Sequence, residues 1–512
     1  MLVKVKTIAV IGIKTVGVDV EVSVASRGAP GFEIVGLPSK ATAESKERLR
    51  TALAHCGFVF PEKRIVVNLA PADLPKEGSI YDLPIAVGII CADKGLPVPQ
   101  DALFFGEVSL DGHLRHCKGA FLLALFAKEN GFDSVFVPKD CCAEAGCIDE
   151  VKVYSLDTLR EILLFLQGEL KMEPQKNTDV LLTSEQFSFE VEVGDLLGQT
   201  KAKRALEIAA AGGHNILFRG SPGSGKTMLA KALPSIMPPL SLQEALEVTK
   251  IYSVVGKIPP NQSLITHRPF RAPHHTSSSA GILGGGTDPM PGEISLAHRG
   301  VLFLDEFAEF SRAVLEALRQ PLEEGSITIS RSRARFSFPA KFLLVASYNP
   351  CPCGFFDHPK IACSCSPSEV RRYRKKLSGP ILDRIDLHVS VESIDAESLS
   401  SNTNQISVQQ DMQDLRKKIM RARQTQLTRY KALNLITNSE LPSKYVNTFC
   451  TLSPDARILL KAAVEKFNLS TRTYFKLIKV AQTVADLDTV SDVTLDHMRE
   501  ALSFRVEQKG IE

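Results

Sequence analysis

A glycine-rich loop in the middle of the chain has the residue types needed to hold a phosphate chain. It follows the apolar segment 216–218 and precedes a helical pattern. Glycines let backbone N–H groups turn toward phosphate oxygens, the lysine can reach the β- and γ-phosphates, and the threonine hydroxyl can bind Mg²⁺. The sequence therefore predicts an ATP site formed by Gly220, Ser221, Pro222, Gly223, Ser224, Gly225, Lys226 and Thr227.

A second segment supplies the carboxylates that such a site needs. Asp305 and Glu306 follow the apolar run 301–304, which is typical of a buried parallel strand. Asp305 is predicted to hold Mg²⁺ together with Thr227, and Glu306 to polarise the attacking water. An isolated Asp-Glu pair could also be the first turn of a helix. Its combination with Lys226 favours the catalytic interpretation.

Four of the 11 cysteines form two C-x-C pairs, Cys351 with Cys353 and Cys363 with Cys365. Four thiolates can bind zinc in a closed tetrahedral site, which is structural rather than catalytic. The spacing is tighter than that of most zinc motifs, so four reduced thiols remain an equal alternative. The odd, uneven distribution of cysteines disfavours paired disulfides and indicates a reducing compartment.

The elements that must position these residues fall into four segments of the 512-residue chain. Residues 1–168 mix alternating strand patterns with helices (α+β), and 169–189 is a polar linker. In 190–392 short apolar strands alternate with helices, which predicts an α/β fold with a parallel sheet. Residues 393–512 are predicted to be mainly helical, with helices over 412–430 and 455–487.

Composition excludes several classes of protein. Hydrophobic residues make up 44% and charged residues 23%, which disfavours wholesale disorder. A net charge of +3 is too small to mark the whole molecule as a nucleic-acid binder. The longest apolar run, 83–92, is too short to span a bilayer, so we expect a cytoplasmic protein without membrane association.

Longer motifs resemble one family of ATPases. The segments GQTKAKRALEIAAAGGHN from Gly198, RPFRAPHHTSSSAGILGGG from Arg268, PGEISLAHRGVLFLDEF from Pro291 and LSGPILDRIDLHV from Leu377 are similar to magnesium-chelatase-related AAA+ ATPases. Within that clade the chain resembles the YifB/ComM family. GFEIVGLPSKATAESKERLR and VNLAPADLPKEGSIYDLPIA extend the resemblance to the leading segment.

The resemblance implies a Lon-protease-like domain, an AAA+ P-loop NTPase core with a C-terminal helical lid, and a hexameric DNA helicase that promotes branch migration in natural transformation. It also implies three further catalytic residues: Asn349 as sensor 1, Arg384 as an arginine finger that acts on the next subunit, and Arg472 as sensor 2. Their alternatives are an Asn-Pro turn, a surface salt bridge with Asp383 or Asp386, and a solvated helix arginine.

Basic charge is concentrated between residues 331 and 376, where ten Lys or Arg and two Asp or Glu give a local net charge of +8. Arg331, Arg333 and Arg335 alternate, so a strand would point all three to one face and could hold a DNA backbone. A solvated hairpin is the alternative. RRYRKK at 371–376 could stack Tyr373 on a base or contact a neighbouring subunit.

Other functions remain to be weighed against a DNA motor. A chelatase-like ATPase subunit or a protein-remodelling ATPase would share the nucleotide site without DNA activity. An ATP-dependent protease would need a serine nucleophile and a lysine base, for which only Lys76 and Ser79 are candidates. A nucleotide-gated scaffold would require Glu306 or Arg384 to be idle, and nothing in the sequence indicates that.

Overall fold

The computed structural model describes residues 1–25, 29–74, 76, 78–175, 189–259, 262–286, 289–330, 335–377, 379–392 and 405–505. The chain forms two compact units. The first comprises Met1–Ser184 and Ser241–Thr266, and the second Glu185–Leu240 and His267–Glu512. Residues 241–266 therefore pack with the N-terminal unit, although sequence patterns placed them in the ATPase core. Among the described residues, no helix is long and apolar enough to cross a membrane.

The first unit is built on a seven-stranded mixed sheet, with strand order β3-β4-β2-β1-β5-β8-β9. The alternating valines of the sequence form β2, whose inward residues Val18, Val20 and Val22 are almost fully buried. β1, β2 and β4 are antiparallel neighbours, whereas β5, β8 and β9 are parallel. The strands are β1 (Leu2–Ile11), β2 (Lys14–Val24), β3 (Gly31–Val35), β4 (Arg64–Ala70), β5 (Ala102–Phe104), β8 (Ser134–Pro138) and β9 (Lys152–Leu156).

Helices cover this sheet, and one of them comes from the distant segment 241–266. α2 (Asp82–Lys94) is apolar on all sides because it is buried against β1 and β2. α8 (Leu242–Val255) packs on α3 (Ala120–Asn130). The buried carboxylate of Glu144 joins them, since it accepts the N–H of Phe121 and the hydroxyl of Ser253. The other helices are α1 (Lys40–His55), α4 (Cys142–Ala145) and α5 (Leu159–Gln167).

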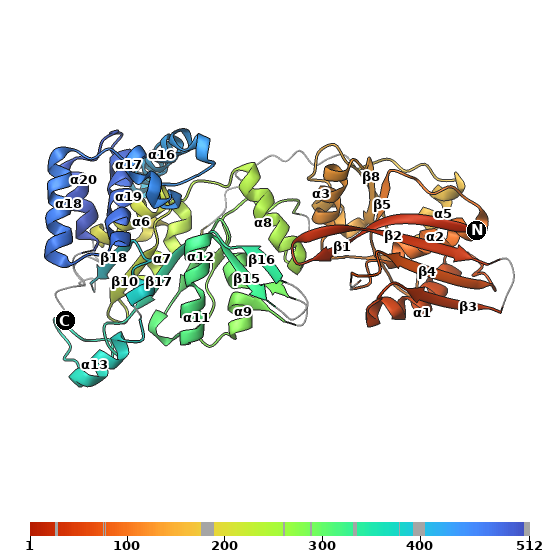
Figure 1. Ribbon diagram of the computed structural model, residues 1–512, viewed down its shortest axis with the longest axis horizontal. Helices are drawn as coiled ribbons and strands as arrows, with labels where there is room; N and C mark the ends of the chain where they lie inside the picture. The colour runs from red at the N-terminus through yellow and green to blue at the C-terminus, as the bar shows by residue number, and fades with distance from the viewer. Residues whose placement is uncertain are drawn as a thin grey trace. The chain divides into compact units, whose positions relative to one another are not determined.

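The second unit contains a five-stranded parallel sheet with order β11-β14-β17-β10-β18. Figure 1 labels β17, β10 and β18 of this sheet. The predicted α/β class with a parallel sheet is therefore confirmed. Because parallel strands end at the same edge, the residues that follow β14, β17 and β10 lie close together. The strands are β10 (Ile216–Gly220), β11 (Phe270–Arg271), β14 (Val301–Leu304), β17 (Leu343–Tyr348) and β18 (Leu387–Val391).

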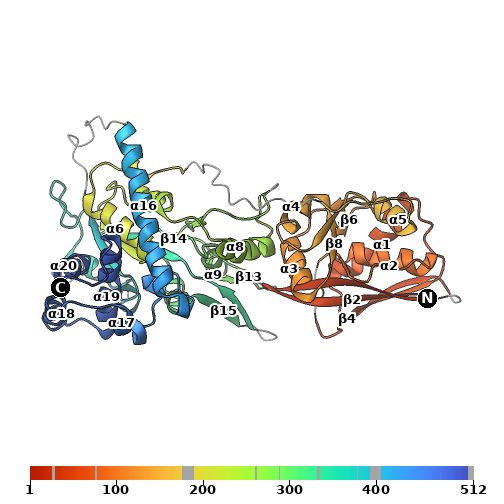
Figure 2. The same ribbon diagram turned by 90° about the horizontal axis from the view of Figure 1, so that it is seen from above.

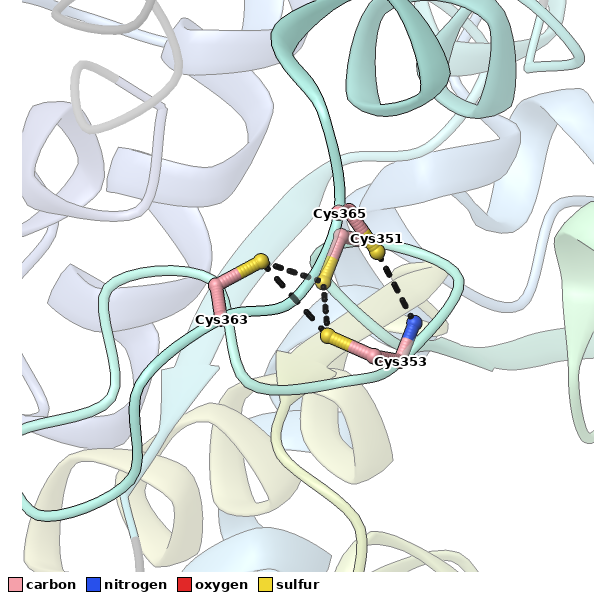
Figure 3. Close-up of side chains that lie close together, drawn as sticks. All are labelled: Cys351, Cys353, Cys363 and Cys365. Carbon is pink, nitrogen blue, oxygen red and sulfur yellow. Dashed lines mark hydrogen bonds between the residues drawn. The ribbon is translucent and has the colours of Figure 1, made fainter.

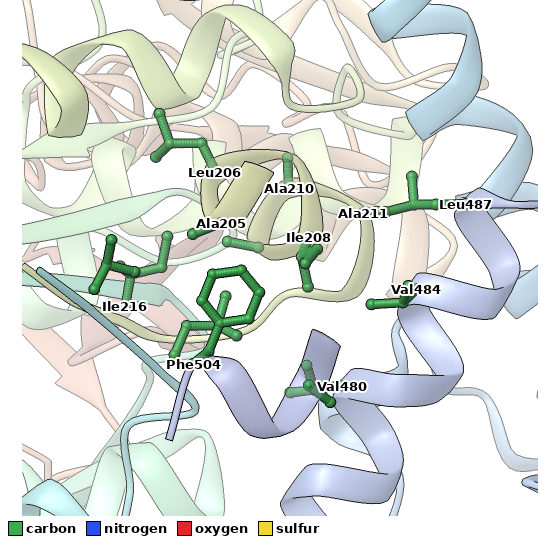
Figure 4. Packing of buried hydrophobic residues seen from close by; sticks show 14 of the residues in the cluster. Ala205, Leu206, Ile208, Ala210, Ala211, Ile216, Val480, Val484, Leu487 and Phe504 are labelled. Carbon is green, nitrogen blue, oxygen red and sulfur yellow. The ribbon is translucent and has the colours of Figure 1, made fainter. Parts of the chain in front are cut away.

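A helical region follows the sheet and shares its core. The long helix α16 packs against α6 and α19 (Figure 2). Apolar residues of α6 and α19, such as Ile208 and Val480, meet Phe504 in one buried cluster (Figure 4). The helices of this region are α16 (Gln405–Arg429), α17 (Ser443–Phe449), α18 (Pro454–Phe467), α19 (Thr471–Leu487) and α20 (Leu495–Ser503). Two earlier helices of the same unit are α6 (Thr200–Gly212), before β10, and α7 (Lys226–Ala232), after β10.

One sequence expectation needs correction, and another is only partly covered by the described residues. The helical segment predicted over 455–487 is two helices, α18 and α19, because Asn468 has φ 45° and ends the first. The strand predicted through Arg331, Arg333 and Arg335 stays a prediction, because Arg331 and Arg333 lie outside the described residues. β15 (Ser326–Ser330) and β16 (Arg335–Pro339) pair antiparallel as a hairpin in which Ser330 lies opposite Arg335.

Candidate functional site

The glycine-rich loop connects β10 to α7 at the carboxyl edge of the parallel sheet. Gly223 and Gly225 have φ of 76° and 89°, which L-residues with a side chain rarely adopt. A Cβ on Gly220 would lie 2.3 Å from the carbonyl oxygen of Val391, so only glycine fits there. Pro222, Gly223 and Thr227 are exposed, which leaves the outer side of the loop open to a ligand.

Lys226 lies inside this loop. Its ammonium donates to the carbonyls of Gly220 at 2.9 Å and Ser221 at 2.7 Å, and to Oδ1 of Asn349 at 3.2 Å. Asn349 directly follows β17, the neighbour of β10. Burial lowers the pKa of Lys226, and the carboxylate of Asp305 opposes this shift. The two predicted residues Lys226 and Asn349 are therefore in direct contact.

Thr227 and Asp305 meet on the other side of the loop. The Thr227 hydroxyl donates to Oδ2 of Asp305 at 2.9 Å, and Asp305 directly follows β14. The buried Ser347 donates to the second oxygen, Oδ1. Hydroxyl and carboxylate oxygens are ligands that suit Mg²⁺. Thr227 and Asp305 could hold this ion, which would neutralise phosphate charge when bound.

Glu306 is the next residue, and its backbone is unusual. Its φ is 52°, the left-handed region, and it precedes the short helix Phe307–Glu309. The side chain is 52% exposed, and its Oε2 lies 3.0 Å from Nδ1 of His275. A carboxylate at this position, beside Asp305 and near the loop, can accept a proton from water. Sequence spacing did not indicate the pair with His275.

Arg384 and Arg472 lie together, and neither contacts Lys226 among the contacts of the described residues. Nη2 of Arg384 donates to Oε1 of Glu323 at 2.5 Å, and Nη2 of Arg472 contacts the same oxygen. Glu323 belongs to α12 (Arg319–Glu324). Desolvation lowers the pKa of Arg384, and the Glu323 charge partly compensates. The salt bridge considered for Arg384 forms with Glu323 rather than with Asp383 or Asp386.

The four predicted cysteines converge (Figure 3). The thiols of Cys351, Cys353, Cys363 and Cys365 all lie within 4.8 Å of one another. Three S–S separations are 3.3, 3.5 and 3.7 Å. Zinc–sulfur bonds of about 2.3 Å in a tetrahedron require separations of about 3.8 Å. Backbone hydrogen bonding at Phe355 is the largest cause that lowers the pKa of Cys353 to about 5, whereas desolvation and the neighbouring thiols raise the pKa of Cys363 and Cys365. The donor set is compatible with zinc.

The cysteine loop also lies against the phosphate loop. Gly354 has φ 86°, and a Cβ there would lie 2.5 Å from Cδ of Pro222. Arg219, at the end of β10, is 3.6 Å from the carboxylate of Asp357. Cys351 is only two residues beyond Asn349. The thiol cluster therefore adjoins two parts of the predicted ATP site.

The predicted DNA-binding arginines are only partly described. Arg331 and Arg333 lie outside the described residues, and Arg335 is exposed at the start of β16. The neighbouring basic segment contributes to α13 (Pro367–Arg374), whose Arg371 and Arg372 are exposed. Tyr373 is 6% exposed. A base could not stack on this buried ring without displacing its neighbours, so the stacking alternative is not supported.

The two residues weighed for a protease do not form a pair. The Lys76 ammonium donates to the carbonyl of Pro71, and the Ser79 hydroxyl donates to Glu107. A serine nucleophile needs its base within hydrogen-bond reach. These contacts direct the hydroxyl of Ser79 to a carboxylate rather than to the lysine.

Comparison with known families gives three matches along the chain. Residues 192–399 match "Magnesium chelatase, subunit ChlI", 20–141 match "Subunit ChlI of Mg-chelatase", and 409–505 match the C-terminal region of the same subunit. The first match contains every residue of the candidate nucleotide site except Arg472, which lies in the third. An ATPase activity is implied by this family.

Individual relatives match over nearly their whole length. The chain is 41% identical over 505 residues to "Competence protein ComM" of Haemophilus influenzae, which covers 97% of this chain and 96% of the relative. It is 40% identical to "Uncharacterized protein YifB" of Escherichia coli, with 98% and 96% coverage. It is 39% identical to "Uncharacterized protein Rv2897c" of Mycobacterium tuberculosis, with 98% and 97% coverage. The chain therefore belongs to the YifB/ComM family of magnesium-chelatase-related AAA+ ATPases.

Proposed function

We propose that this protein is an ATP-driven, ring-forming DNA motor that promotes branch migration during DNA uptake and recombination. The proposed ATP hydrolysis rests on two hydrogen bonds, one between Lys226 and Asn349 and one between Thr227 and Asp305. The proposed action on DNA is supported by similarity, over nearly the full length, to a relative named a competence protein.

Each residue has a defined task in this proposal. Lys226 exchanges its loop carbonyls for β- and γ-phosphate oxygens, and Asn349 then orients the attacking water. Asp305 and Thr227 hold the metal ion. Glu306 accepts a proton from the water as it attacks the γ-phosphorus, and ADP leaves with the β–γ bridging oxygen.

A ring completes the site. An arginine that enters the neighbouring subunit's site stabilises charge in the transition state, and Arg384 is our candidate. Arg384 does not contact Lys226, Asp305 or Glu306 of its own chain among the contacts of the described residues. We propose a hexamer, with residues 1–168 as a Lon-protease-like domain and α16–α20 with Arg472 as the helical lid. The protein would act in the cytoplasm.

We also propose that the four-cysteine cluster binds one structural zinc ion. Four thiolates fill a tetrahedral shell, so no position is left for a substrate. The N–H of Cys353 donates to Sγ of Cys365 at 3.4 Å, and the N–H of Phe356 to Sγ of Cys351 at 3.3 Å. Such N–H groups stabilise sulfur charge around a bound metal.

The first test measures ATP hydrolysis by the full-length protein without DNA and with single-stranded, duplex or four-way-junction DNA. Glu306→Gln should keep ATP binding and lose turnover by about 10²-fold or more, which excludes a contaminating ATPase. Lys226→Ala should abolish nucleotide-dependent function. DNA stimulation would support the motor, and hydrolysis indifferent to every DNA would instead favour a chelatase-like or protein-remodelling ATPase.

A second test addresses DNA contact. Arg331, Arg333 and Arg335 changed together to Ala should weaken DNA binding about tenfold or more and reduce its salt dependence, while basal hydrolysis stays largely intact. A matched triple variant of the exposed arginines Arg50, Arg160 and Arg499 removes the same charge elsewhere. Equal DNA affinity in the two triple variants would show that the arginines 331–335 are not the binding surface.

A further inference from the structure

His275 is brought to Glu306 by the order of the strands. β11 and β14 are parallel neighbours, with Phe270 opposite Val301 and Arg271 opposite Leu302. His275 lies four residues beyond β11, and Glu306 lies two residues beyond β14. The segments that leave the two strands therefore run along the same edge of the sheet.

The side chains of His275 and Glu306 lie close to each other. Nδ1 of His275 is 3.0 Å from Oε2 of Glu306. The imidazole is itself restrained, because His274 packs on one side with ring centroids 4.2 Å apart and Phe310 meets it edge-on at 6.4 Å. The backbone of Glu306 is fixed by its left-handed φ, but its side chain has three torsions of its own. Among the contacts of the described residues, the Glu306 carboxylate is paired with His275, which can restrict these torsions.

We propose that His275 is a positioning residue for Glu306 in ATP hydrolysis, an inference that rests on the proposed ATPase function. In this role an Nδ1–H group would donate to Oε2, which lies 3.0 Å away, and a carboxylate has a second oxygen that can accept from water. By holding Oε2, His275 orients Oε1 toward the attacking water. Misplacement of a catalytic group by about 1 Å can cost about 10²-fold in rate, so this restraint has a measurable effect.

The same contact would have the opposite effect if His275 held Glu306 away from the water. Removal of His275 would then raise turnover. The sign of the change in kcat therefore decides between an orienting and a sequestering contact.

The test compares His275→Asn with His275→Leu in the full-length protein. Asn and Leu have similar shapes, but only Asn keeps an N–H donor near the place of Nδ1. We expect Leu to lower kcat about 10- to 100-fold with KM for ATP and nucleotide affinity within about twofold of wild type, and Asn to restore much of kcat. In a Glu306→Gln background, His275→Leu should have little further effect.

Controls separate this role from a structural one. His113→Ala removes a matched histidine–carboxylate contact, since Nδ1 of His113 is 3.3 Å from Asp111 in the N-terminal unit. It should leave kcat unchanged. If His275→Leu does not fold, His275→Asp supplies the same comparison with Asn, because an ionised Asp has the same shape, donates nothing and repels Glu306.

The outcomes distinguish the inference from the function on which it rests. Three outcomes would overturn the positioning role while the ATPase proposal stands. The kcat of His275→Leu could be unchanged or higher than that of wild type, its KM for ATP could rise by as large a factor as kcat falls, or His275→Asn could fail to restore kcat. A wild-type rate that Glu306→Gln leaves unaltered would overturn both.

Discussion

Arg384 and Arg472 share one acceptor, oxygen Oε1 of Glu323, although they are separated by 88 positions, with Arg384 in a turn before β18 and Arg472 in α19. Arg384 also donates to the carbonyl of Pro380 at 2.6 Å. The side chain of Arg384 is only 12% exposed, whereas that of Arg472 is 45% exposed. One carboxylate therefore balances two like charges that resemblance assigns to catalysis.

Removal of this carboxylate should destabilise the protein. Glu323→Ala leaves the largely buried Arg384 beside Arg472 without the shared negative charge, which should cost about 1–2 kcal/mol in the free energy of unfolding. Urea unfolding of the full-length protein measures the change. Glu324→Ala is the matched control, because Glu324 is exposed on the same helix and accepts from Gln320. Equal effects of the two substitutions would contradict the special role of Glu323.

Subunit mixing tests whether Arg384 acts on a neighbour. Glu306→Gln and Arg384→Ala should each be nearly inactive alone. If one site takes Glu306 from one subunit and Arg384 from the next, a mixed ring contains some sites with both wild-type residues, and mixing should restore a fraction of the ATPase rate. A Glu306→Gln/Arg384→Ala double variant mixed with Lys226→Ala is the control. No subunit in that mixture has both Lys226 and Glu306, so no complete site can form. Mixtures that stay as inactive as their components would argue against an arginine supplied between subunits.

Asn349 should affect turnover more than nucleotide binding. Its Oδ1 holds the Lys226 ammonium at 3.2 Å, and in the proposed mechanism its amide orients the water. Asn349→Ala should lower kcat about 10- to 100-fold with nucleotide affinity changed by less than about threefold. Steady-state kinetics and binding of a fluorescent ATP analogue measure the two quantities. Asn130→Ala, which removes an exposed amide bonded to Phe126, should change neither.

Local signals in the sequence predicted much of this site. The phosphate loop follows β10, Asp305 follows β14, and Asn349 follows β17, each as the apolar runs before them indicated. Because these strands are parallel neighbours, their carboxyl ends lie at the same edge of the sheet. The alternating valines likewise predicted β2. These features depend on patterns of four to ten residues, which a sequence displays directly.

Contacts between distant side chains could not be predicted in this way. Ser347 beside Asp305, His275 beside Glu306, and Glu323 between two arginines all depend on strand order and helix packing, which no spacing encodes. The docking of α8 on α3 through Glu144 is of the same kind. The alternating arginines show a different limit, because a short alternation fits either a strand or the end of a hairpin, and only Arg335 lies within the described residues.

The cysteine cluster yields a prediction that joins metal content to the nucleotide site. Purified protein should contain about one zinc per chain, and Cys351→Ser should abolish it, since three thiolates and a hydroxyl form a weaker site. Because Gly354 packs on Pro222 and Cys351 lies two residues from Asn349, zinc loss should also lower thermal stability and weaken ATP binding. Elemental analysis, thermal unfolding and nucleotide titration measure these effects.

The matched control is Cys56→Ser, a half-buried free cysteine in the N-terminal unit, which should retain zinc, thermal stability and ATP affinity. Chelation of wild-type protein should reproduce the Cys351→Ser effects, and added zinc should reverse them only when all four thiols are present. Protein that carries no zinc and takes up none under reducing conditions would contradict the metal site. Zinc loss without any change in ATP affinity would instead show that the packing of Gly354 on Pro222 is maintained by the protein alone.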